Sequence, residues 1–433
     1  MSIQFDKNQE KWSETALKEF LEIEKKGVNF TVYFLIGSHA DDDIQVAHIA
    51  KCPLPGTVDA EEGDSSSTTV DEEWVTDHSE KVLRMLSGGI SIIGMAAVCS
   101  KEVFNEQRTM LNRALARTYK MTTVMSTLEL DVMPSKMGLI HVDTSLKNTS
   151  AIIIDVVNRG PDAPSRINFS KLNWVSLVSR VAVDIRTAIE PTSKDDFYAE
   201  FNAALKPWAT NLFSEDTVVL FGGELREDSE TIVKDQKKGK IVSSFDAEIL
   251  LACGSESGES VVEGRKRGEV FEVSFDLAVR ACVSFKATVK EAKHALYHHI
   301  LRSLLARAAL HYESMELQEE GPRASPALHQ LPRAATTVLP CAGSILVYDF
   351  LFEGDSADDA IKNFHQLIGI KPSTEEVDDL WERNLSEGEV EEPSLIIQHL
   401  HKHADPSGIS RKMIILAVVF VLLAFILYQV VKK

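Results

Sequence analysis

The stretch that decides the fold is residues 71–99, which read DEEWVTDHSEKVLRMLSGGISIIGMAAVC. Its first half predicts a helix over residues 74–86, because four large side chains recur at the spacing of one helical face: Trp74, His78, Val82 and Met85. The acidic residues in front of this helix stabilise its start, where the backbone dipole is positive. Gly88 and Gly89 then predict a turn, and the uncharged run over residues 90–98 predicts a buried strand.

Further helices and strands are expected on both sides of this helix–turn–strand unit. Apolar residues at helical spacing predict helices over residues 10–26, 101–118, 195–208, 289–315 and 357–368. Apolar runs and alternating patterns predict strands over residues 30–36, 44–50, 139–145, 151–157, 174–186, 271–285 and 337–352. Ser356 and Asp359 resemble a capping box at the start of the last helix. This mixture predicts an α/β or α+β fold, a mixed sheet with flanking helices.

The clearest strand signal is the strict alternation over residues 271–285. Apolar residues from Phe271 to Phe285 alternate there with mostly polar ones such as Glu272, Ser274 and Arg280. Side chains on a strand point alternately to opposite faces of its sheet. The pattern therefore predicts a half-buried strand with one face in the core and one in solvent.

Changes in composition along the chain predict four regions. We expect a first cytosolic domain over residues 1–215, with a mobile acidic loop at residues 57–73. A second α+β region is expected over residues 216–370. Residues 371–411 are acidic and poor in apolar side chains, which predicts a flexible tether. Residues 412–433 are expected to form one C-terminal transmembrane helix.

The predicted anchor contains the 19 residues from Met413 to Val431, with Gln429 as their one polar side chain and no charge. As a helix this segment would be about 28 Å long, at about 1.5 Å per residue. That length matches the roughly 27 Å hydrocarbon core of an endoplasmic reticulum bilayer. Core helices of soluble domains are usually shorter and carry a polar face. The residues expected in the bilayer include Met413, Leu416, Phe420, Leu422, Leu423, Phe425, Leu427 and Val431.

The position of this segment predicts the topology of the chain. A terminal span inserts after translation, and the start of the sequence has no apolar stretch of the signal-peptide kind, so the body is expected to face the cytosol. Five cysteines without a CxxC pair predict free thiols in a reducing compartment. A net charge of −19 argues against binding to nucleic acid or to anionic lipid.

Catalytic and cofactor motifs are missing from the sequence. It contains no P-loop, GxGxxG, GxSxG or HExxH pattern, so no cofactor is expected. His294 and His298 lie four residues apart on a predicted helix, but no further ligand is near them in the sequence, which favours a solvated helix face. A second group of histidines precedes the anchor and is interpreted as a juxtamembrane segment: His399, His401 and His403.

Several stretches resemble the odorant-response-abnormal four family of tail-anchored endoplasmic reticulum proteins. The similar stretches are Asp71 to His78, Arg84 to Gly89, Ile92 to Gly94, Leu339-Pro340, Val347 to Phe350 and Ser356-Ala357. With the anchor they span almost the whole length, and residues 190–330 match only loosely. The resemblance implies a factor for the folding, maturation and trafficking of chemosensory (odorant) G-protein-coupled receptors, including their localisation to cilia. It also implies partnership with a protease specific for the ubiquitin-fold modifier.

The first sheet resembles the MPN domain of JAMM metalloproteases, through strands that end in Phe34 to Gly37 and Ile92 to Gly94. Active members carry Glu, two His, Ser and Asp at set positions of this domain. Those positions hold other residues here: Phe30, Ala97, Cys99, Gln107 and Met110. A catalytic zinc site needs three protein ligands and a base for its water. The resemblance thus implies a metal-free, non-enzymatic MPN-like scaffold.

MPN-like domains commonly pair through the helix that matches residues 74–86. Asp77, Lys81 and Arg84 are therefore the expected partner-binding residues for the modifier protease. The leading hypothesis is a non-enzymatic adaptor of the endoplasmic reticulum membrane. The alternatives are an isopeptidase-like MPN enzyme and a membrane tethering protein, although residues 371–411 lack the heptad repeats that fusion proteins use. Span length and family resemblance favour the endoplasmic reticulum over the mitochondrial outer membrane.

Overall fold

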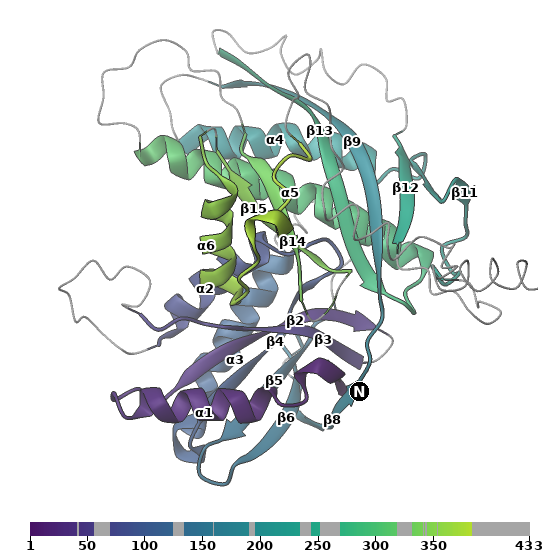
Figure 1. Cartoon of the computed structure of the whole chain (residues 1–433). Helices are drawn as coiled ribbons and strands as arrows, with labels where there is room; N and C mark the ends of the chain where they lie inside the picture. Colours follow the sequence, from purple (N-terminus) through teal and green to yellow (C-terminus); the bar gives the residue numbers. More distant parts are fainter. Residues whose placement is uncertain are drawn as a thin grey trace, which may run out of the picture.

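The computed structural model describes most of the chain up to residue 382 (Figure 1). The described residues are 1–40, 43–55, 70–123, 134–158, 160–189, 195–233, 244–251, 269–317, 331–340, 342, 344–352 and 354–382. No helix within these ranges is long and apolar enough to cross a bilayer. The predicted anchor at 412–433 and the tether beyond residue 382 lie outside the described residues, as do residues 57–69 of the predicted acidic loop.

The first sheet has eight strands in the order β7-β6-β5-β4-β2-β3-β1-β8. Their bounds are β1 (Ile3–Asp6), β2 (Thr31–Ala40), β3 (Asp43–Lys51), β4 (Ser91–Cys99), β5 (Lys136–Asp143), β6 (Asn148–Asp155), β7 (Ala163–Ser165) and β8 (Ile167–Ser170). Strands β7 and β8 lie at opposite ends of this order, yet Arg166 alone separates them in the chain. The sheet must therefore curl until its two edges meet, and short, protected edges of this kind resist pairing with other chains.

Alternate residues of β2 build a core on each face of the first sheet. Tyr33 and Leu35 pack with Phe20 of α1 (Trp12–Glu24) on one face. Phe34 and Ile36 pack on the other face, with helices α2 (Glu72–Arg84) and α3 (Lys101–Thr123). The predicted helix–turn–strand unit is thus confirmed as α2 and β4, with shifts of one or two residues at its ends.

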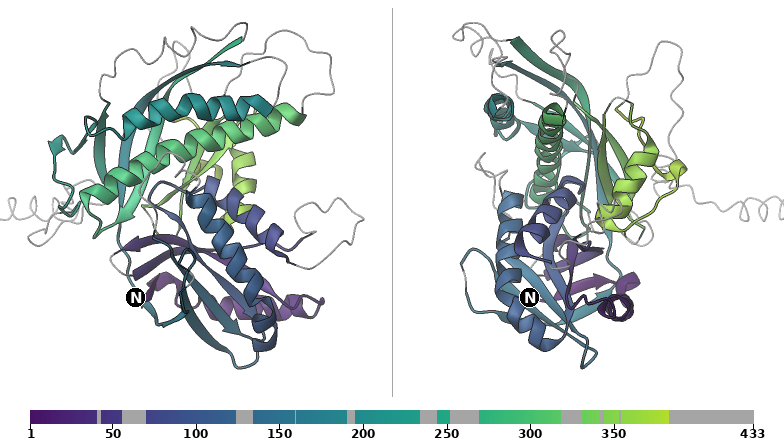
Figure 2. Two further views of the ribbon diagram at one scale, coloured as in Figure 1. Left: turned by 180° about the vertical axis from the view of Figure 1, so that it is seen from behind. Right: turned by 90° about the vertical axis from the view of Figure 1, so that its left-hand side faces the viewer.

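The second sheet has the order β11-β10-β12-β9-β13 and is covered on one face by two helices (Figure 2). Its strands are β9 (Trp174–Ile189), β10 (Val218–Phe221), β11 (Glu224–Leu225), β12 (Ser244–Leu250) and β13 (Glu269–Ser284). The helices are α4 (Asp195–Leu212) and α5 (Val289–Leu317). Because β9 belongs to this sheet, the second unit begins at Trp174, well before the predicted boundary at 215/216.

A C-terminal unit follows, made of the hairpin β14 (Arg333–Val338) and β15 (Leu346–Leu351), helix α6 (Ala357–Ile368) and the short helix η3 (Thr374–Glu376). The prediction grouped its first part with the second region. In the structure Phe364 and Ile368 of α6 instead enter the core cluster of the first sheet, with Phe34 and Val75. Residues 371–382 also pack on the body, so the prediction of a tether starting at residue 371 is wrong for this part.

The prediction of a half-buried strand is wrong for the described side chains of β13. Leu277, Val279 and Ala281 face the core shared with α5, as expected. Arg280 and Cys282 on the opposite face are 3% and 1% exposed. The C-terminal unit covers that face, and the Tyr348 hydroxyl donates a hydrogen bond of 3.0 Å to the Arg280 carbonyl. Alternation revealed the pleat of the strand, but it could not reveal a cover supplied by residues far along the chain.

The three units meet at the turn between α2 and β4, residues 85–90. The Arg302 guanidinium on α5 donates hydrogen bonds to the carbonyls of Leu86, Ser87 and Ile90, at 3.2, 3.4 and 2.9 Å. The Tyr348 amide of β15 donates to the Met85 carbonyl at 2.8 Å. The Cys282 amide of β13 donates to the Gly88 carbonyl, also at 2.8 Å. One short turn therefore ties both sheets and the hairpin together.

Gly88 and Gly89 allow this close approach. A Cβ atom at Gly88 would lie 2.0 Å from the Ala295 carbonyl oxygen, and one at Gly89 would lie 2.2 Å from the Cys282 carbonyl oxygen. Gly89 also has a φ of 81°, in the left-handed region that L side chains avoid. The predicted turn is confirmed, and the structure adds that the missing side chains make room for α5 and β13.

Substitution of Gly89 tests this packing. Gly89→Ala should lower the free energy of unfolding by several kcal/mol, because it combines the left-handed penalty of roughly 1–2 kcal/mol with a backbone clash. Gly27→Ala is the matched control, since Gly27 has a φ of 91° but nothing within 4 Å of an added Cβ. Urea denaturation of both variants measures the difference. Equal losses would show that the turn is not tightly enclosed.

Candidate functional site

The five positions to which the resemblance assigns the functional residues of active JAMM enzymes lie mostly in the core. Phe30, Ala97 and Cys99 are 5%, 0% and 0% exposed and belong to one apolar cluster. The pairing of Thr31 with Val98 brings Phe30, at the start of β2, close to the end of β4. Gln107 and Met110 lie half-buried on α3, and Met110 packs against the same cluster. Four of the five side chains therefore pack in or against this apolar cluster: Phe30, Ala97, Cys99 and Met110.

Cys99 is the one residue of this set whose type is a usual zinc ligand. Burial, and then the charge of Asp143, raise the pKa of the Cys99 thiol to about 12. A thiol with this pKa stays protonated at neutral pH, and only the thiolate binds a metal or attacks a carbonyl. Cys52 and Cys282 are likewise free and buried, which confirms the prediction of free thiols for these three cysteines. Cys253 and Cys341 lie outside the described residues.

A histidine lies beside Cys99 but does not complete a site. The His141 Nε2 atom is 3.1 Å from the Cys99 carbonyl oxygen, and its ring stacks on Phe104 at 4.1 Å. Desolvation lowers the pKa of His141. Among the residues that the structure describes, no three His, Cys, Asp or Glu side chains gather as a metal site would require.

The structure describes two of the other histidines that the sequence analysis named, His294 and His298 of α5. His298 is 9% exposed, so the prediction of a solvated helix face is wrong at this residue, while His294 is half-buried. Desolvation, followed by the charges of Arg302 and His294, lowers the pKa of His298 to about 4. The face is buried because α5 packs between the second sheet and the turn at residues 85–90. His399, His401 and His403 lie outside the described residues.

Helix α2 presents the face that the sequence predicted to the core. Its N-cap Asp71 accepts a hydrogen bond of 2.8 Å from the Trp74 amide. His78, Val82 and Met85 are buried, and Trp74 is half-buried, with its indole N–H donating to the Pro53 carbonyl at 2.8 Å. The helix therefore has only a narrow strip left for solvent.

The three predicted partner-binding residues are not equivalent. Asp77 and Lys81 are exposed on the outer side of α2. Arg84 is half-buried and forms ion pairs with Glu80 at 2.9 Å and with Glu313 of α5 at 3.0 Å. A change at Arg84 would therefore loosen a contact within the chain, whereas Asp77 and Lys81 report on the surface alone.

Two buried histidines bind the end of α6 to the first sheet and to α2. The His48 Nε2 atom lies 2.8 Å from the Ile368 carbonyl oxygen, and His78 hydrogen-bonds to the Leu367 carbonyl. These carbonyls are in the last turn of a helix and have no partner within it. Desolvation lowers the pKa of both rings, that of His78 to about 4. The rings are thus neutral donors, and nothing in the sequence pattern distinguished them from ordinary core residues.

Acidification should lower the free energy of unfolding through the buried histidines whose pKa is lowered, in particular His78 and His298. A histidine with a lowered folded pKa contributes stability that is present above the unfolded pKa of about 6.5 and is lost as pH falls below it. For His78 and His298 the loss between about pH 7 and about pH 5.5 should be on the order of 1 kcal/mol each. Burial raises the pKa of Asp349 to about 6, which acts in the opposite direction.

Comparing the doubly substituted chain with the unsubstituted one isolates the contribution of His78 and His298 to the pH dependence of stability. In H78Q/H298Q the free energy of unfolding, measured by denaturant titration at each pH, should fall less on acidification than in the unsubstituted chain. The contribution of Asp349 cancels in this comparison. Parallel pH dependences in the two proteins would contradict the assignment.

Comparison with known proteins gives the family. The model described as Odorant response abnormal 4-like matches residues 33–379. Odorant response abnormal protein 4 of Caenorhabditis elegans is 36% identical, over 98% of this chain and 92% of that protein. The odr-4 homologue of Xenopus tropicalis is 24% identical, over 81% of each chain. The Homo sapiens homologue is 25% identical, over 69% of each chain.

A solved structure is also similar over much of the chain. It is a crystal structure of UfSP from C. elegans, with a TM-score of 0.42 and 10% identity, and the match covers 86% of this chain and 57% of that one. The family resemblance stated from the sequence is confirmed by the sequence comparisons, which cover both ends of the described body. With a family match over residues 33–379 and a relative 36% identical along nearly its full length, the chain belongs to the Odorant response abnormal 4-like family.

Proposed function

We propose that this chain is a non-enzymatic adaptor in the odorant-receptor pathway. It assists the folding, maturation and trafficking of chemosensory G-protein-coupled receptors, and it recruits a protease specific for the ubiquitin-fold modifier. The names of its family and of its Caenorhabditis elegans relative, which refer to an abnormal odorant response, support the pathway. The adaptor role and the protease partner go further and depend on the site described above.

The observation that carries the non-enzymatic assignment is the packing of the degenerate metal position. A hydrolytic zinc site needs an open coordination position for water. Phe30, Ala97 and Cys99 are sealed in an apolar cluster instead, and the Cys99 thiol is held protonated. In this proposal the first sheet is an MPN-like scaffold whose remaining role is binding.

The exposed strip of α2 is the proposed protease-binding surface. Asp77 and Lys81 lie there on a helix that α3 supports through a 2.9 Å hydrogen bond between the Ser79 and Thr118 hydroxyl groups. A rigid helix face favours binding, because few side chains must be ordered when the partner docks.

Charge reversal at Lys81 tests this surface. K81E should reduce co-purification of the modifier protease while circular dichroism and melting stay near those of the unsubstituted chain. K18E on α1 is the matched control, because Lys18 is also an exposed helical lysine but lies on another element. Normal recovery of the protease by K81E would place the partner on another face.

The membrane anchor of the proposal is residues 412–433, inserted in the endoplasmic reticulum with the body in the cytosol. Arginine at both Leu422 and Leu423 should abolish anchoring, since each charge at mid-span costs roughly 2.5–3.5 kcal/mol on insertion scales. Carbonate extraction should then leave the variant in the soluble fraction, whereas L422A/L423A should remain with the membranes. Retention of the arginine variant would mean that another segment anchors the chain.

Two other functions make different predictions. An isopeptidase-like MPN enzyme would contain stoichiometric zinc, so elemental analysis of the purified full chain in detergent separates it from the adaptor. We expect substoichiometric zinc and a melting temperature that chelators leave unchanged. A membrane tether would bridge vesicles without the protease or a receptor, which a vesicle aggregation assay would detect.

A further inference from the structure

The last described residues form an acidic segment that is bound like a peptide ligand. Residues 378–382 read Asp-Asp-Leu-Trp-Glu. Asp378 pairs with Thr336 of β14, and each amide donates to the other residue's carbonyl at 2.8 Å. Addition of an extended segment to a strand edge is a common mode of peptide recognition, in which backbone pairing supplies affinity and side-chain pockets supply specificity.

The carboxylate of Glu382 joins three elements. The Arg307 Nη2 atom of α5 lies 2.9 and 2.7 Å from its two oxygens. The amides of Ala278 on β13 and Ala334 on β14 donate to it at 3.2 and 2.8 Å. The Glu382 and Arg307 side chains are only 3% and 2% exposed. Charge-assisted hydrogen bonds of this kind are stronger than neutral ones, and they specify a carboxylate.

Trp381 lies between two arginines. The Arg280 guanidinium is 3.9 Å from the centre of its ring, and that of Arg180 on β9 is 5.0 Å away. Arginine over an indole face is the most favourable form of cation–π contact. The segment is therefore recognised through one aromatic side chain as well as through its charges.

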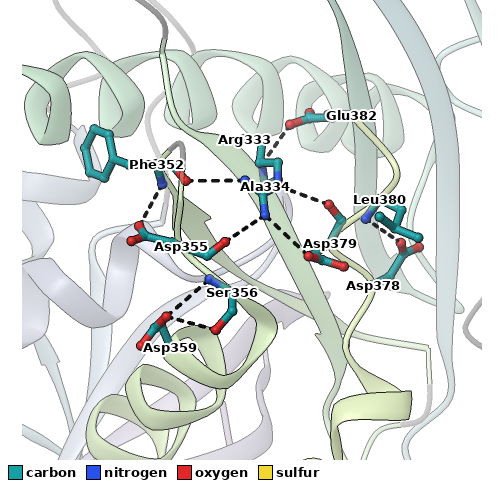
Figure 3. A network of polar contacts seen from close by, with 10 residues as sticks. All are labelled: Arg333, Ala334, Phe352, Asp355, Ser356, Asp359, Asp378, Asp379, Leu380 and Glu382. Atoms are coloured by element: carbon teal, nitrogen blue, oxygen red, sulfur yellow. Dashed lines mark hydrogen bonds and ion pairs between the residues drawn. The ribbon is translucent and has the colours of Figure 1, made fainter. Parts of the chain in front are cut away.

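Asp379 makes the third ionic contact, with Arg333 of β14 (Figure 3). The Arg333 Nη2 atom is 3.4 Å from the Asp379 carboxylate, and Nε donates to the Asp379 carbonyl at 3.3 Å. The same guanidinium donates to the carbonyls of Phe352 and Asp355 at 3.3 and 3.1 Å, which fixes its position in front of the segment.

Residues 378–382 leave part of the hydrogen-bonding capacity of the surrounding arginines unused. Arg280 is 3% exposed, and neither of its terminal nitrogens has a hydrogen-bond partner among the described residues. Its ion pair with Asp378 spans 4.0 Å, and the other oxygen of the Asp378 carboxylate accepts a hydrogen bond from the Leu380 amide. Removing the counter-charge of a buried arginine is strongly destabilising, because it leaves an uncompensated charge in the interior. The groove therefore requires an acidic occupant, and Arg280 retains capacity for a better-placed one.

We propose that Arg180, Arg280, Arg307 and Arg333 form a binding groove for an acidic peptide that carries a tryptophan directly before a glutamate, which residues 378–382 occupy within the chain and which such a peptide from a partner protein enters when they are released. The four arginines come from β9, β13, α5 and β14. The proposal is independent of the proposed function.

Release of the segment within the full chain tests the groove. W381A/E382Q weakens the indole and carboxylate contacts, and the probe is a fluorescent peptide of residues 374–382. By fluorescence anisotropy in detergent, the released variant should bind this peptide at least about tenfold more tightly than the unsubstituted chain. Addition of R307Q to the released variant should abolish the gain. A control peptide with Asn and Gln in place of its acidic residues should not bind.

A second arrangement keeps the test decisive if the released variant unfolds. A specific protease site inserted after Lys371, which is exposed, allows the folded chain to be cut while residues 378–382 are still in place. The acidic peptide should then displace the C-terminal fragment in proportion to its concentration, and the neutral peptide should not. If the acidic peptide binds no better than the neutral one in both arrangements, the segment only closes the core and the proposal is wrong.

Discussion

The arrangement of the molecule depends on the binding of three turn carbonyls by the guanidinium of Arg302. Carbonyl groups in the turn between α2 and β4 have no ladder or helix partner, and a planar guanidinium with five donors can satisfy several of them at once. Burial lowers the pKa of Arg302 to about 10, so it keeps its charge at neutral pH. Gly88 and Gly89 let the turn come close enough to be bound in this way. Both sheets and the hairpin consequently share one centre and are held in a fixed arrangement.

The core of the first sheet is likewise shared with the C-terminal unit. Helix α6 adds Phe364 and Ile368 to the core that holds Phe30, Ala97 and Cys99, and His48 and His78 bind its last carbonyls. A hydrolytic centre requires polar ligands at a place that water and substrate can reach. These positions are occupied by apolar packing from two distant parts of the chain. A group of buried charged side chains lies on the other face of β13, around Trp381 and Glu382.

Elements whose ends depend on neighbouring residues were predictable. Helix α6 runs from Ala357 to Ile368 as expected, because Ser356 and Asp359 cap its start and Gly369, with a φ of 73°, ends it. The capping box is confirmed by both of its hydrogen bonds. The strand predicted over residues 337–352 contains β15 but only the last two residues of β14, and the pairing of the two strands as a hairpin was not predicted. The exposed positions of Asp77 and Lys81 also followed from helical spacing.

The sequence by itself determined the family and the order of most helices and strands, since each is a matter of residue identity or local spacing. Only the tertiary structure decided that residues 277–284 of β13 are buried on both faces and that residues 378–382 are bound rather than free. Periodicity reports which face of an element is apolar, over a few residues. Whether the opposite face meets water depends on a contact such as Glu382 with Arg307, between residues far apart in the chain, and no local pattern encodes it.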